Sequence, residues 1–316
     1  MKNILVVGGA GYIGGAVTDR LGQYNLKVYD NLLYEEEYRK PADFVYGDVR
    51  DREKLKKHLE WADAVIWLAA IVGDPACNLN PDLTLEVNER SVKWLAENFD
   101  GRLVFLSTCS VYGANDKVLD EEAITNPLSL YAWTKLISES YLGNKNSIIF
   151  RLGTVFGVSD TYSRVRMDLV VNLLAARAWA QGKITVFGGE QHRPLIHAKD
   201  VALAIEQVVD NDIRGVFNLN GVNVKIVDLA EMFKEHFPGL TVESTGVKFQ
   251  DNRTYSVSSE KAENVIGFKP QYTVAEGIRE VKELLISRRI KDFTKERYSN
   301  IEHLKNNGQA FAKTDF

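Results

Sequence analysis

An apolar run that leads directly into closely spaced glycines is the feature of this sequence that most restricts its fold. Residues 4–7 are all apolar, and Gly8, Gly11 and Gly14 lie at and just beyond their end, where a helical pattern over residues 12–22 begins. Glycines at this spacing allow a tight turn, a close approach of the backbone to a ligand and close packing of the helix on the strand. A pyrophosphate then binds the unpaired N–H groups at the helix N-terminus. The pattern predicts a dinucleotide-binding strand–turn–helix unit.

An acidic residue at the end of the second apolar stretch indicates which dinucleotide binds. Asp30 follows Gly8 by 22 positions and ends the stretch that begins at residue 26. A carboxylate at this place accepts a hydrogen bond from the ribose 2′-OH of NAD and repels the 2′-phosphate of NADP. The order of strand, glycines, helix, second strand and Asp30 argues against a glycine-rich turn without a ligand. The sequence therefore predicts NAD as the cofactor.

Composition excludes several other classes of protein. With 316 residues, 45% of them hydrophobic and 26% charged, the chain is long enough for one large or two medium domains. A net charge of −4 argues against broad binding to nucleic acid or anionic membranes, and no window approaches the ~20 apolar residues of a membrane span. Cys77 and Cys109 do not make a disulfide framework, and the five histidines show no zinc spacing, so no metal is expected. We expect a reduced, cytoplasmic protein without a signal peptide.

Strand-like and helical patterns alternate through the first half of the chain. The predicted strands span residues 3–7, 26–30, 43–46, 63–68, 102–107 and 147–151, and the predicted helices span 12–22, 51–60, 81–99 and 129–142. Such alternation favours a parallel sheet with helices on both faces. The predicted fold is α/β, a Rossmann-type doubly wound parallel sheet.

The rhythm changes after residue 157. A helical pattern over 167–181 precedes a short strand at 184–187, and a helix at 199–209 then leads to a strand at 215–219 that could return to the main sheet. We therefore expect a NAD-binding domain at 1–157, completed by about 195–220. A smaller C-terminal α/β substrate domain would comprise 158–194 and 221–316. Its polar end, 289–316, is expected to be a peripheral helix or a frayed tail.

Tyr131 and Lys135 form the candidate catalytic pair. Their spacing of four places both side chains on one face of a helix. A lysine ammonium close to a phenol lowers a pKa that is ordinarily ~10, and the phenolate can then act as a general base on a sugar hydroxyl. Tyr141 and Lys145 repeat the spacing, but Gly143 between them indicates the end of the helix. The first pair is therefore preferred.

Thr108 is the third candidate catalytic residue. It ends an apolar strand 23 residues before Tyr131. Ligands of open α/β sheets bind at the carboxyl ends of the strands, where the Thr108 hydroxyl could bind the reacting oxygen. The alternative is a hydroxyl that merely ends a strand.

Taken together, these motifs resemble the extended short-chain dehydrogenase/reductase family, specifically its NAD-dependent nucleotide-sugar epimerases and dehydratases. The resemblance covers nearly the whole chain. It rests on the glycine motif and Asp30, and on segments 47–49, 68–70, 107–113, 131–135, 151–157 and 193–197.

The resemblance implies a role for each matching residue. The cofactor would be bound by Gly8, Gly11, Tyr12, Ile13, Gly14, Asp30, Asn31, Asp48, Val49, Leu68, Ala69, Ala70, Tyr131 and Lys135. Asp48 and Val49 would line the adenine pocket, and Thr108, Tyr131 and Lys135 would form the catalytic triad. Arg193 would bind the diphosphate of a nucleotide sugar, assisted by Arg253, for which a surface salt bridge is an equal alternative.

Departures from the family pattern narrow the chemistry. The family's sugar 4,6-dehydratases carry Asp-Glu after the catalytic threonine, whereas this chain has Cys109 and Ser110, which argues against dehydration. Thr154 replaces an asparagine that often contacts substrate phosphate. Arg166 and Asn172 are further candidate substrate contacts, with ordinary surface residues at a helix start as the alternative.

The expected function is oxidation of a nucleotide sugar at C4 by hydride transfer to NAD, most simply in a UDP-glucose 4-epimerase-like enzyme. The alternatives are a nucleotide-sugar or nucleotide-heptose 4-dehydrogenase or ketoreductase, and a non-catalytic NAD-binding sensor. The resemblance further implies a homodimer built from the helices near 81–99 and 129–142, where Trp94 could be buried.

Overall fold

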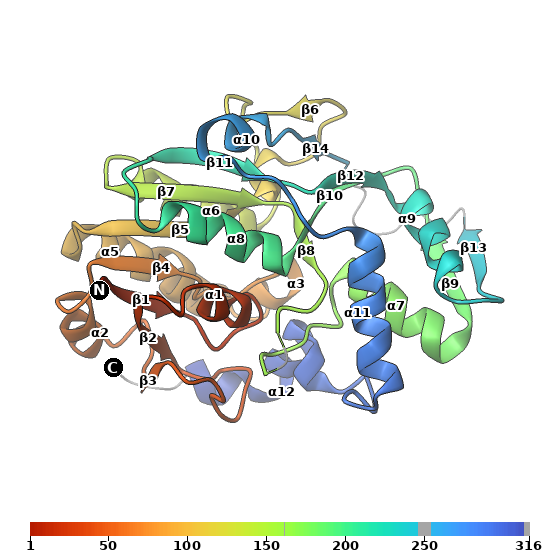
Figure 1. Ribbon diagram of the computed structural model, residues 1–316, viewed down its shortest axis with the longest axis horizontal. Coiled ribbons are helices and arrows are strands. Elements are labelled where there is room, and N and C mark those ends of the chain that lie inside the picture. Colours follow the sequence, from red (N-terminus) through yellow and green to blue (C-terminus); the bar gives the residue numbers. More distant parts are fainter. Residues whose placement is uncertain (161, 246–253, 313–316) are drawn as a thin grey trace.

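A seven-stranded parallel sheet forms the centre of the protein. The computed structural model describes residues 1–160, 162–245 and 254–312. The strand order is β11-β7-β5-β4-β1-β2-β3, and every neighbouring pair is parallel (Figure 1). The strands are β1 (Asn3–Val7), β2 (Asn25–Asp30), β3 (Asp43–Tyr46), β4 (Ala64–Trp67), β5 (Arg102–Thr108), β7 (Ser147–Leu152) and β11 (Gly215–Leu219). The predicted fold class is confirmed, and the strand expected at 215–219 pairs with β7.

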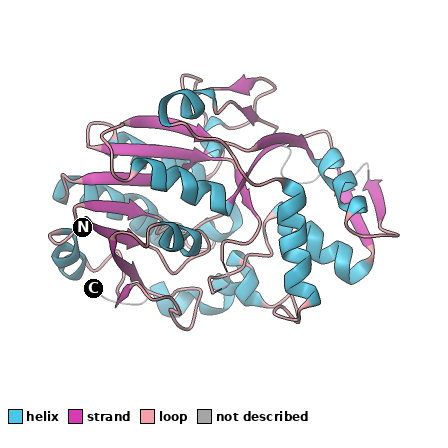
Figure 2. Ribbon diagram, in the orientation of Figure 1, coloured by secondary structure: helices cyan, strands magenta, loops and turns pink. Residues whose placement is uncertain are grey.

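Helices cover both faces of this sheet (Figure 2). They are α1 (Gly14–Arg20), α2 (Arg52–Leu59), α3 (Asp74–Cys77), α4 (Pro81–Leu85), η1 (Glu86–Arg90), α5 (Ser91–Asn98), α6 (Leu130–Leu142) and α8 (Ala198–Val208). Ile4 and Val6 of β1 pack in one core with α1 and α8, while Leu5 and Val7 pack in another with α2 and α5. Alternate residues of one strand thus fill two cores, which explains the unbroken apolar run.

The helix predicted at 81–99 is interrupted by one π-helical stretch, η1. Within it the Asn88 side chain donates to the Ile71 carbonyl and accepts from the Ile71 N–H, both at 2.8 Å. The Asn88 carbonyl accepts from Ser138 of α6 at 2.9 Å. The π-helical turn therefore fastens the loop after β4 to the helix that carries Tyr131, at the edge of the sheet where ligands bind.

Smaller sheets and further helices build the other part of the protein. The strands are β6 (Val118–Leu119), β8 (Thr154–Phe156), β9 (Lys183–Phe187), β10 (His192–His197), β12 (Val222–Lys225), β13 (Thr241–Thr245) and β14 (Ser256–Val257), and they pair as β12-β10-β8, β13-β9 and β14-β6. The helices are η2 (Cys109–Tyr112), α7 (Val170–Gln181), α9 (Ile226–Met232), η3 (Phe233–Glu235), α10 (Glu260–Ile266) and α11 (Val274–Ile286). Most of them enclose a separate core around α7 and α11. The expected domain boundaries stay a prediction.

One expectation for this part is corrected, and one open alternative is decided. The helix predicted to begin at residue 167 begins at Val170, because Leu169 has an extended backbone. For the end of the chain, expected as a peripheral helix or a frayed tail, the described residues show a helix: after η4 (Glu296–Tyr298), residues Asn300–Ala312 form α12. Leu304 of α12 is buried in the core beside α2 and α5. The described residues include no helix with both the length and the apolar character needed to cross a membrane.

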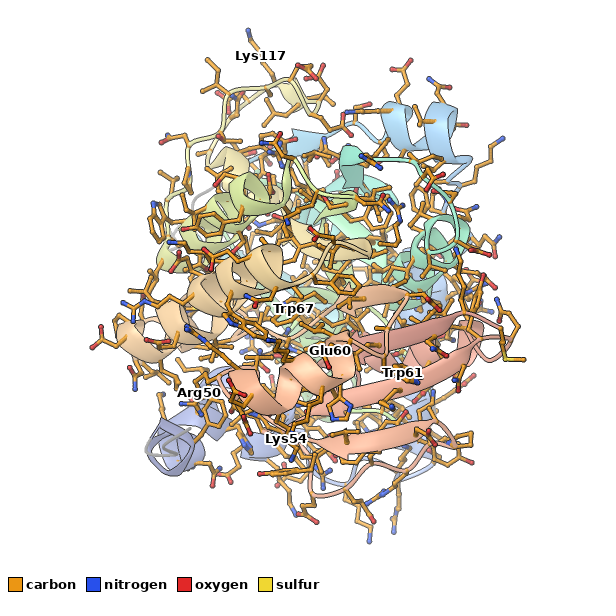
Figure 3. The ribbon with its side chains drawn as sticks, turned by 90° about the vertical axis from the view of Figure 1, so that its left-hand side faces the viewer. Arg50, Lys54, Glu60, Trp61, Trp67 and Lys117 are labelled. Atoms are coloured by element: carbon orange, nitrogen blue, oxygen red, sulfur yellow. The ribbon has the colours of Figure 1, made fainter. Side chains whose placement is uncertain are left out.

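Contacts from α12 reach the first half of the chain. The Arg50 guanidinium donates to the Phe311 carbonyl at 2.9 Å and lies 4.4 Å from the centre of the Phe311 ring. Figure 3 shows Arg50 near the start of α2, on the side where α12 lies. His303 hydrogen-bonds the Leu33 carbonyl at 2.7 Å. These contacts hold α12 beside the loop that follows β2.

Candidate active site

A cavity of about 470 Å³ lies at the carboxyl ends of the central strands. Its lining from the first half of the chain includes Gly8, Gly11, Tyr12, Ile13, Gly14, Asp30, Asn31, Tyr34, Val49, Leu68, Ala69, Ala70, Asp74, Thr108, Tyr131 and Lys135. The second half contributes Thr154, Arg164, Arg166, Asp168, Arg193, Tyr255, Asn300 and Phe311. Most of the predicted site residues therefore line one cavity, although they come from separate segments of the chain.

Two glycines of the turn, Gly8 and Gly14, have no space for a side chain. A Cβ atom on Gly14 would lie 2.2 Å from the Gly9 carbonyl oxygen, and one on Gly8 would lie 2.4 Å from the Ala69 nitrogen. Gly8 also has a φ of 82°, which favours glycine. No side chain caps the N-terminus of α1. The N-cap residue therefore leaves the first N–H groups of α1 without a side-chain cap, as a pyrophosphate site requires.

Asp30 lies half-buried in the cavity wall. Its carboxylate accepts from the Ala10 N–H at 3.0 Å and from the Leu32 N–H at 2.8 Å. Burial raises the pKa of Asp30 to about 6. These bonds hold the carboxylate at the end of β2, where it can also accept from a ribose hydroxyl.

The two residues expected to line the adenine pocket, Asp48 and Val49, have different surroundings in the structure. Val49 lines the cavity, but Asp48 is not among the lining residues. The Asp48 side chain is buried, accepting two hydrogen bonds from the Arg50 guanidinium at 2.9 and 3.0 Å and one from Asn31 at 2.9 Å. Arg50 and Asn31 therefore hold the Asp48 carboxylate next to Val49, and its place in the adenine pocket stays a prediction.

Thr108, Tyr131 and Lys135 line the same part of the cavity. The Lys135 ammonium donates to the Leu106 carbonyl at 2.8 Å, and burial lowers its pKa to about 8. Burial raises the pKa of Tyr131, with a further increase from the buried Cys77 thiol. The expectation that Lys135 lowers the Tyr131 pKa therefore does not hold for the protein alone, because Lys135 is bound to a strand carbonyl and both groups are shielded from water.

The second Tyr-x-x-x-Lys pair lies outside the cavity. The Tyr141 hydroxyl binds Glu89, and this bond raises the pKa of Tyr141 to about 12. Lys145 lies beyond the end of α6 and donates to Asp100 at 2.8 Å. The geometry agrees with the choice of the first pair.

The residues expected to contact the substrate differ in where the structure places them. Thr154 and Arg193 line the cavity, and the Arg193 guanidinium lies 5.7 Å from the centre of the Tyr255 ring. Arg166 also lines it, half-buried, with two hydrogen bonds to Asp168 at 2.9 and 3.1 Å. It is therefore not an ordinary surface arginine. Arg253 lies outside the described residues.

Asn172 is corrected to a structural residue. It is fully buried and does not line the cavity. Its amide oxygen accepts from the Gly157 N–H at 2.9 Å, and its nitrogen donates to the Gly157 and Arg166 carbonyls at 3.1 and 2.8 Å. With these backbone bonds made, the side chain fixes the loop before α7.

Several lining residues were missed by sequence reasoning. Asp74 and Arg164 line the cavity, but neither was singled out from the sequence. The Asp74 carboxylate accepts from the Ser129 hydroxyl at 2.6 Å, at the start of α6 and close to Tyr131. Asn300 and Phe311 come from the presumed tail, where no sequence pattern marks them.

Comparisons with known proteins agree with this geometry. The model of the NAD dependent epimerase/dehydratase family matches residues 4–219. A UDP-glucose 4-epimerase of Rhizobium meliloti is 32% identical, with 87% of this chain and 94% of the relative covered. Another, from Rhizobium leguminosarum bv. trifolii, is 30% identical over 88% of this chain and 95% of its own length.

Solved structures show the same fold. UDP-glucose 4-epimerase from Thermotoga maritima with UDP-glucose has a TM-score of 0.78 and 25% identity, covering 90% of this chain and 99% of that one. MoeE5 in complex with UDP-glucuronic acid and NAD has a TM-score of 0.76 and 25% identity, covering 91% and 99%.

Proposed function

This chain belongs to the NAD-dependent epimerase/dehydratase family, and on that premise we propose that it is a nucleotide-sugar 4-epimerase. It is an NAD-dependent enzyme of the extended short-chain dehydrogenase/reductase type, as the sequence predicted. One observation carries the proposal: Thr108, Tyr131 and Lys135 line the same cavity as the glycine turn and Asp30. This arrangement brings a sugar hydroxyl and a nicotinamide ring within reach of the same groups. Curated relatives are named as UDP-glucose 4-epimerases, which favours a UDP-hexose as the substrate.

The cavity residues fit NAD. Gly8 and Gly14 leave no room for side chains at the turn where a pyrophosphate would bind, and Asp30 would offer its carboxylate to the ribose. Leu68, Ala69 and Ala70 add an apolar and backbone wall between β1 and β5. Bound NAD would supply the hydride acceptor and donor for the sugar C4, and the positive charge of its nicotinamide ring would favour a phenolate at Tyr131.

Each catalytic side chain has one task in this scheme. Tyr131 takes the proton of the sugar 4-OH as the C4–H bond breaks, and it returns that proton when the keto group is reduced. Thr108 binds the same oxygen; its Oγ1 accepts from the Ser110 N–H at 3.1 Å, which leaves its proton available to the substrate. Lys135, held by Leu106, presents its remaining ammonium protons to the cavity.

The structure supports the argument against dehydration. The Cys109 thiol is fully buried and donates to the Arg151 carbonyl at 3.2 Å. Burial raises the pKa of Cys109, so it does not exchange protons with a substrate near neutral pH. Ser110 lines the cavity but has no acidic group. Nothing at these two positions can eliminate water from C5–C6 of a sugar.

Cofactor turnover separates the epimerase from the dehydrogenase or ketoreductase that the same residues could serve. With a panel of UDP-hexoses and other nucleotide hexoses and heptoses, an epimerase uses sub-stoichiometric NAD for many turnovers without net NADH. Sugar NMR should show inversion at C4 while the absorbance of reduced nicotinamide stays flat. Accumulation of NADH matched to a 4-keto sugar would instead establish the dehydrogenase. Binding of NAD with no turnover of any sugar would leave the sensor, which the presence of Thr108, Tyr131 and Lys135 disfavours.

We also propose a homodimer that packs α4–η1–α5 and α6 into a four-helix bundle. Trp133 on α6 is 45% exposed, and Ile137 and Tyr141 continue along the same helical face. Light scattering at micromolar concentration should give twice the mass of the chain, and Trp133→Glu should give the monomer. A monomeric wild type would rule this assembly out.

A role in carbohydrate biosynthesis in the cytoplasm is consistent with these features. Cys77 and Cys109 are both buried free thiols, the state expected in a reducing compartment. Cell fractionation with an antibody to this chain tests the location.

A further inference from the structure

Arg164 is a buried cation at the cavity with no carboxylate bound to it among the described residues. Its side chain is 5% exposed and lines the cavity. Nη1 donates to the Asn300 side-chain oxygen at 2.6 Å, and Nε donates to the Arg297 carbonyl at 3.2 Å. Nη2 is buried, and no hydrogen-bond partner for it occurs in the described parts of the chain. Such a group is costly to bury unless a ligand binds it.

The charges around Arg164 leave one positive charge in excess. Asp168 is the carboxylate at hand, and both its oxygens pair with Arg166. Glu35 pairs with Arg297 at 3.2 Å. Burial, and then repulsion by Arg166, lowers the pKa of Arg164 to about 10. An anion is the ligand that would compensate this charge.

The position of Arg164 indicates which anion. Its chain neighbour Ser163 lies against α1: a Cβ atom on Gly15 would lie 1.7 Å from the Ser163 hydroxyl oxygen. On its other side, the Arg164 guanidinium lies 4.0 Å from the centre of the Tyr34 ring, four residues after Asp30. The Tyr34 hydroxyl is also buried, with no partner among the residues described. These contacts place the segment of Arg164 next to α1 and next to the loop after β2, the two segments that bind the phosphates and the ribose of a dinucleotide in this fold.

We propose that Arg164 binds the pyrophosphate of NAD from the side opposite the glycine turn, with the Tyr34 hydroxyl as a second donor. The inference rests on NAD as the cofactor and is independent of the reaction at the sugar. The cofactor is then held by both halves of the chain, since Arg164 comes from the loop between β8 and α7. A clamp of this kind slows cofactor release, which suits an enzyme that regenerates NAD in each cycle.

Calorimetric titration of the full chain, freed of nucleotide with charcoal, tests the proposal. Arg164→Met should raise the Kd of NAD at least ~10-fold, as expected for loss of a charged hydrogen bond. The Kd of ADP-ribose should rise by a similar factor, and that of UDP should not change. Arg164→Lys, which keeps the charge, should recover part of the affinity. Circular dichroism and melting without nucleotide show whether each variant is folded.

Arg297→Met is the matched control. It removes an arginine that joins the same C-terminal segment to Glu35 but does not line the cavity. It should leave the Kd of NAD within ~2-fold of wild type. Equal losses in the two variants would show that Arg164 only fastens the segment and would overturn the proposal. Unchanged NAD binding in Arg164→Met would also overturn the proposal. A loss of affinity confined to UDP would overturn it by assigning Arg164 to the substrate. A larger loss for NADP than for NAD would overturn it by assigning Arg164 to a 2′-phosphate.

Discussion

Removal of Glu139 tests how the catalytic helix is held on the sheet. Glu139 lies one turn after Lys135 on α6, and its carboxylate accepts three hydrogen bonds from the Arg151 guanidinium of β7 at 2.6, 3.1 and 3.1 Å. Ser107 of β5 donates to the same carboxylate. Both charged side chains are at most 7% exposed. The pair therefore joins α6 to two central strands in a region shielded from water.

Glu139→Ala should lower the free energy of unfolding by about 3–5 kcal/mol, because it leaves the Arg151 guanidinium buried without its carboxylate. The matched control is Arg90→Ala, which breaks an exposed pair with Glu86 one turn apart and should cost about 0.3–0.5 kcal/mol. Urea unfolding followed by circular dichroism gives both values. Activity should fall with Glu139→Ala as well, because α6 carries Tyr131 and Lys135.

The double variant Glu139→Leu with Arg151→Met separates the cost of an unpaired charge from the cost of a lost contact. Apolar residues of similar volume commonly replace a buried ion pair at little cost. About half or more of the stability lost in Glu139→Ala should therefore return, the rest reflecting the Ser107 and Tyr112 hydroxyls, each of which loses a partner. A loss below about 1 kcal/mol in Glu139→Ala, or a double variant less stable than Glu139→Ala, would refute this reasoning.

Three further predictions concern the site. Tyr131→Phe should reduce kcat by ~10²–10⁴-fold while NAD still binds, and Tyr141→Phe should leave kcat nearly unchanged; steady-state kinetics decides, and the reverse pattern would assign catalysis to the second pair. Burial raises the pKa of Asp30 to about 6, so Asp30 becomes neutral as the pH falls below this value, and it then repels a 2′-phosphate less. The preference for NAD over NADP in calorimetric titration should therefore shrink from pH 7.5 to pH 5. A preference that does not change with pH would show that Asp30 does not select the cofactor. Asn172→Ala should destabilise the fold by about 1–3 kcal/mol in urea unfolding and leave the substrate KM nearly unchanged, whereas a raised KM in a stable variant would restore Asn172 as a substrate contact.

The predictable features of this protein depend on short stretches of chain. The central strands and the parallel order follow from apolar runs of four to seven residues that alternate with helices. Small departures have local causes. The π-helical turn within 81–99 reflects the bonds that Asn88 makes to another segment, and α11, a helix of 13 residues, was not predicted as one element.

The errors at the site have one physical origin: a residue's type does not show what its polar atoms bind. Asn172 has the chemistry of a ligand-binding residue, but the backbone of Gly157 and Arg166 already occupies its hydrogen-bonding atoms. The pKa of Tyr131 is another example, since burial outweighs the effect of a lysine one turn away. Neither the hydrogen-bond partners of a side chain nor the effect of burial on its pKa can be predicted from the spacing of residues.

Local sequence is enough to predict the glycine turn, the acidic residue after β2 and the pairing of Tyr131 with Lys135. Each depends on backbone geometry within one turn or helix, or on the order of strands that places them at one sheet edge. In contrast, the common cavity of Arg164, Asn300 and Phe311 becomes visible when the chain is folded. Arg164 and Asn300 are 136 positions apart, and contacts at that separation leave no periodic pattern in the chain. The contact between Arg164 and Asn300 forms because the loop before α7 and the helix α12 meet at the cavity. The position of these two segments depends on buried charge and shape rather than on local propensity.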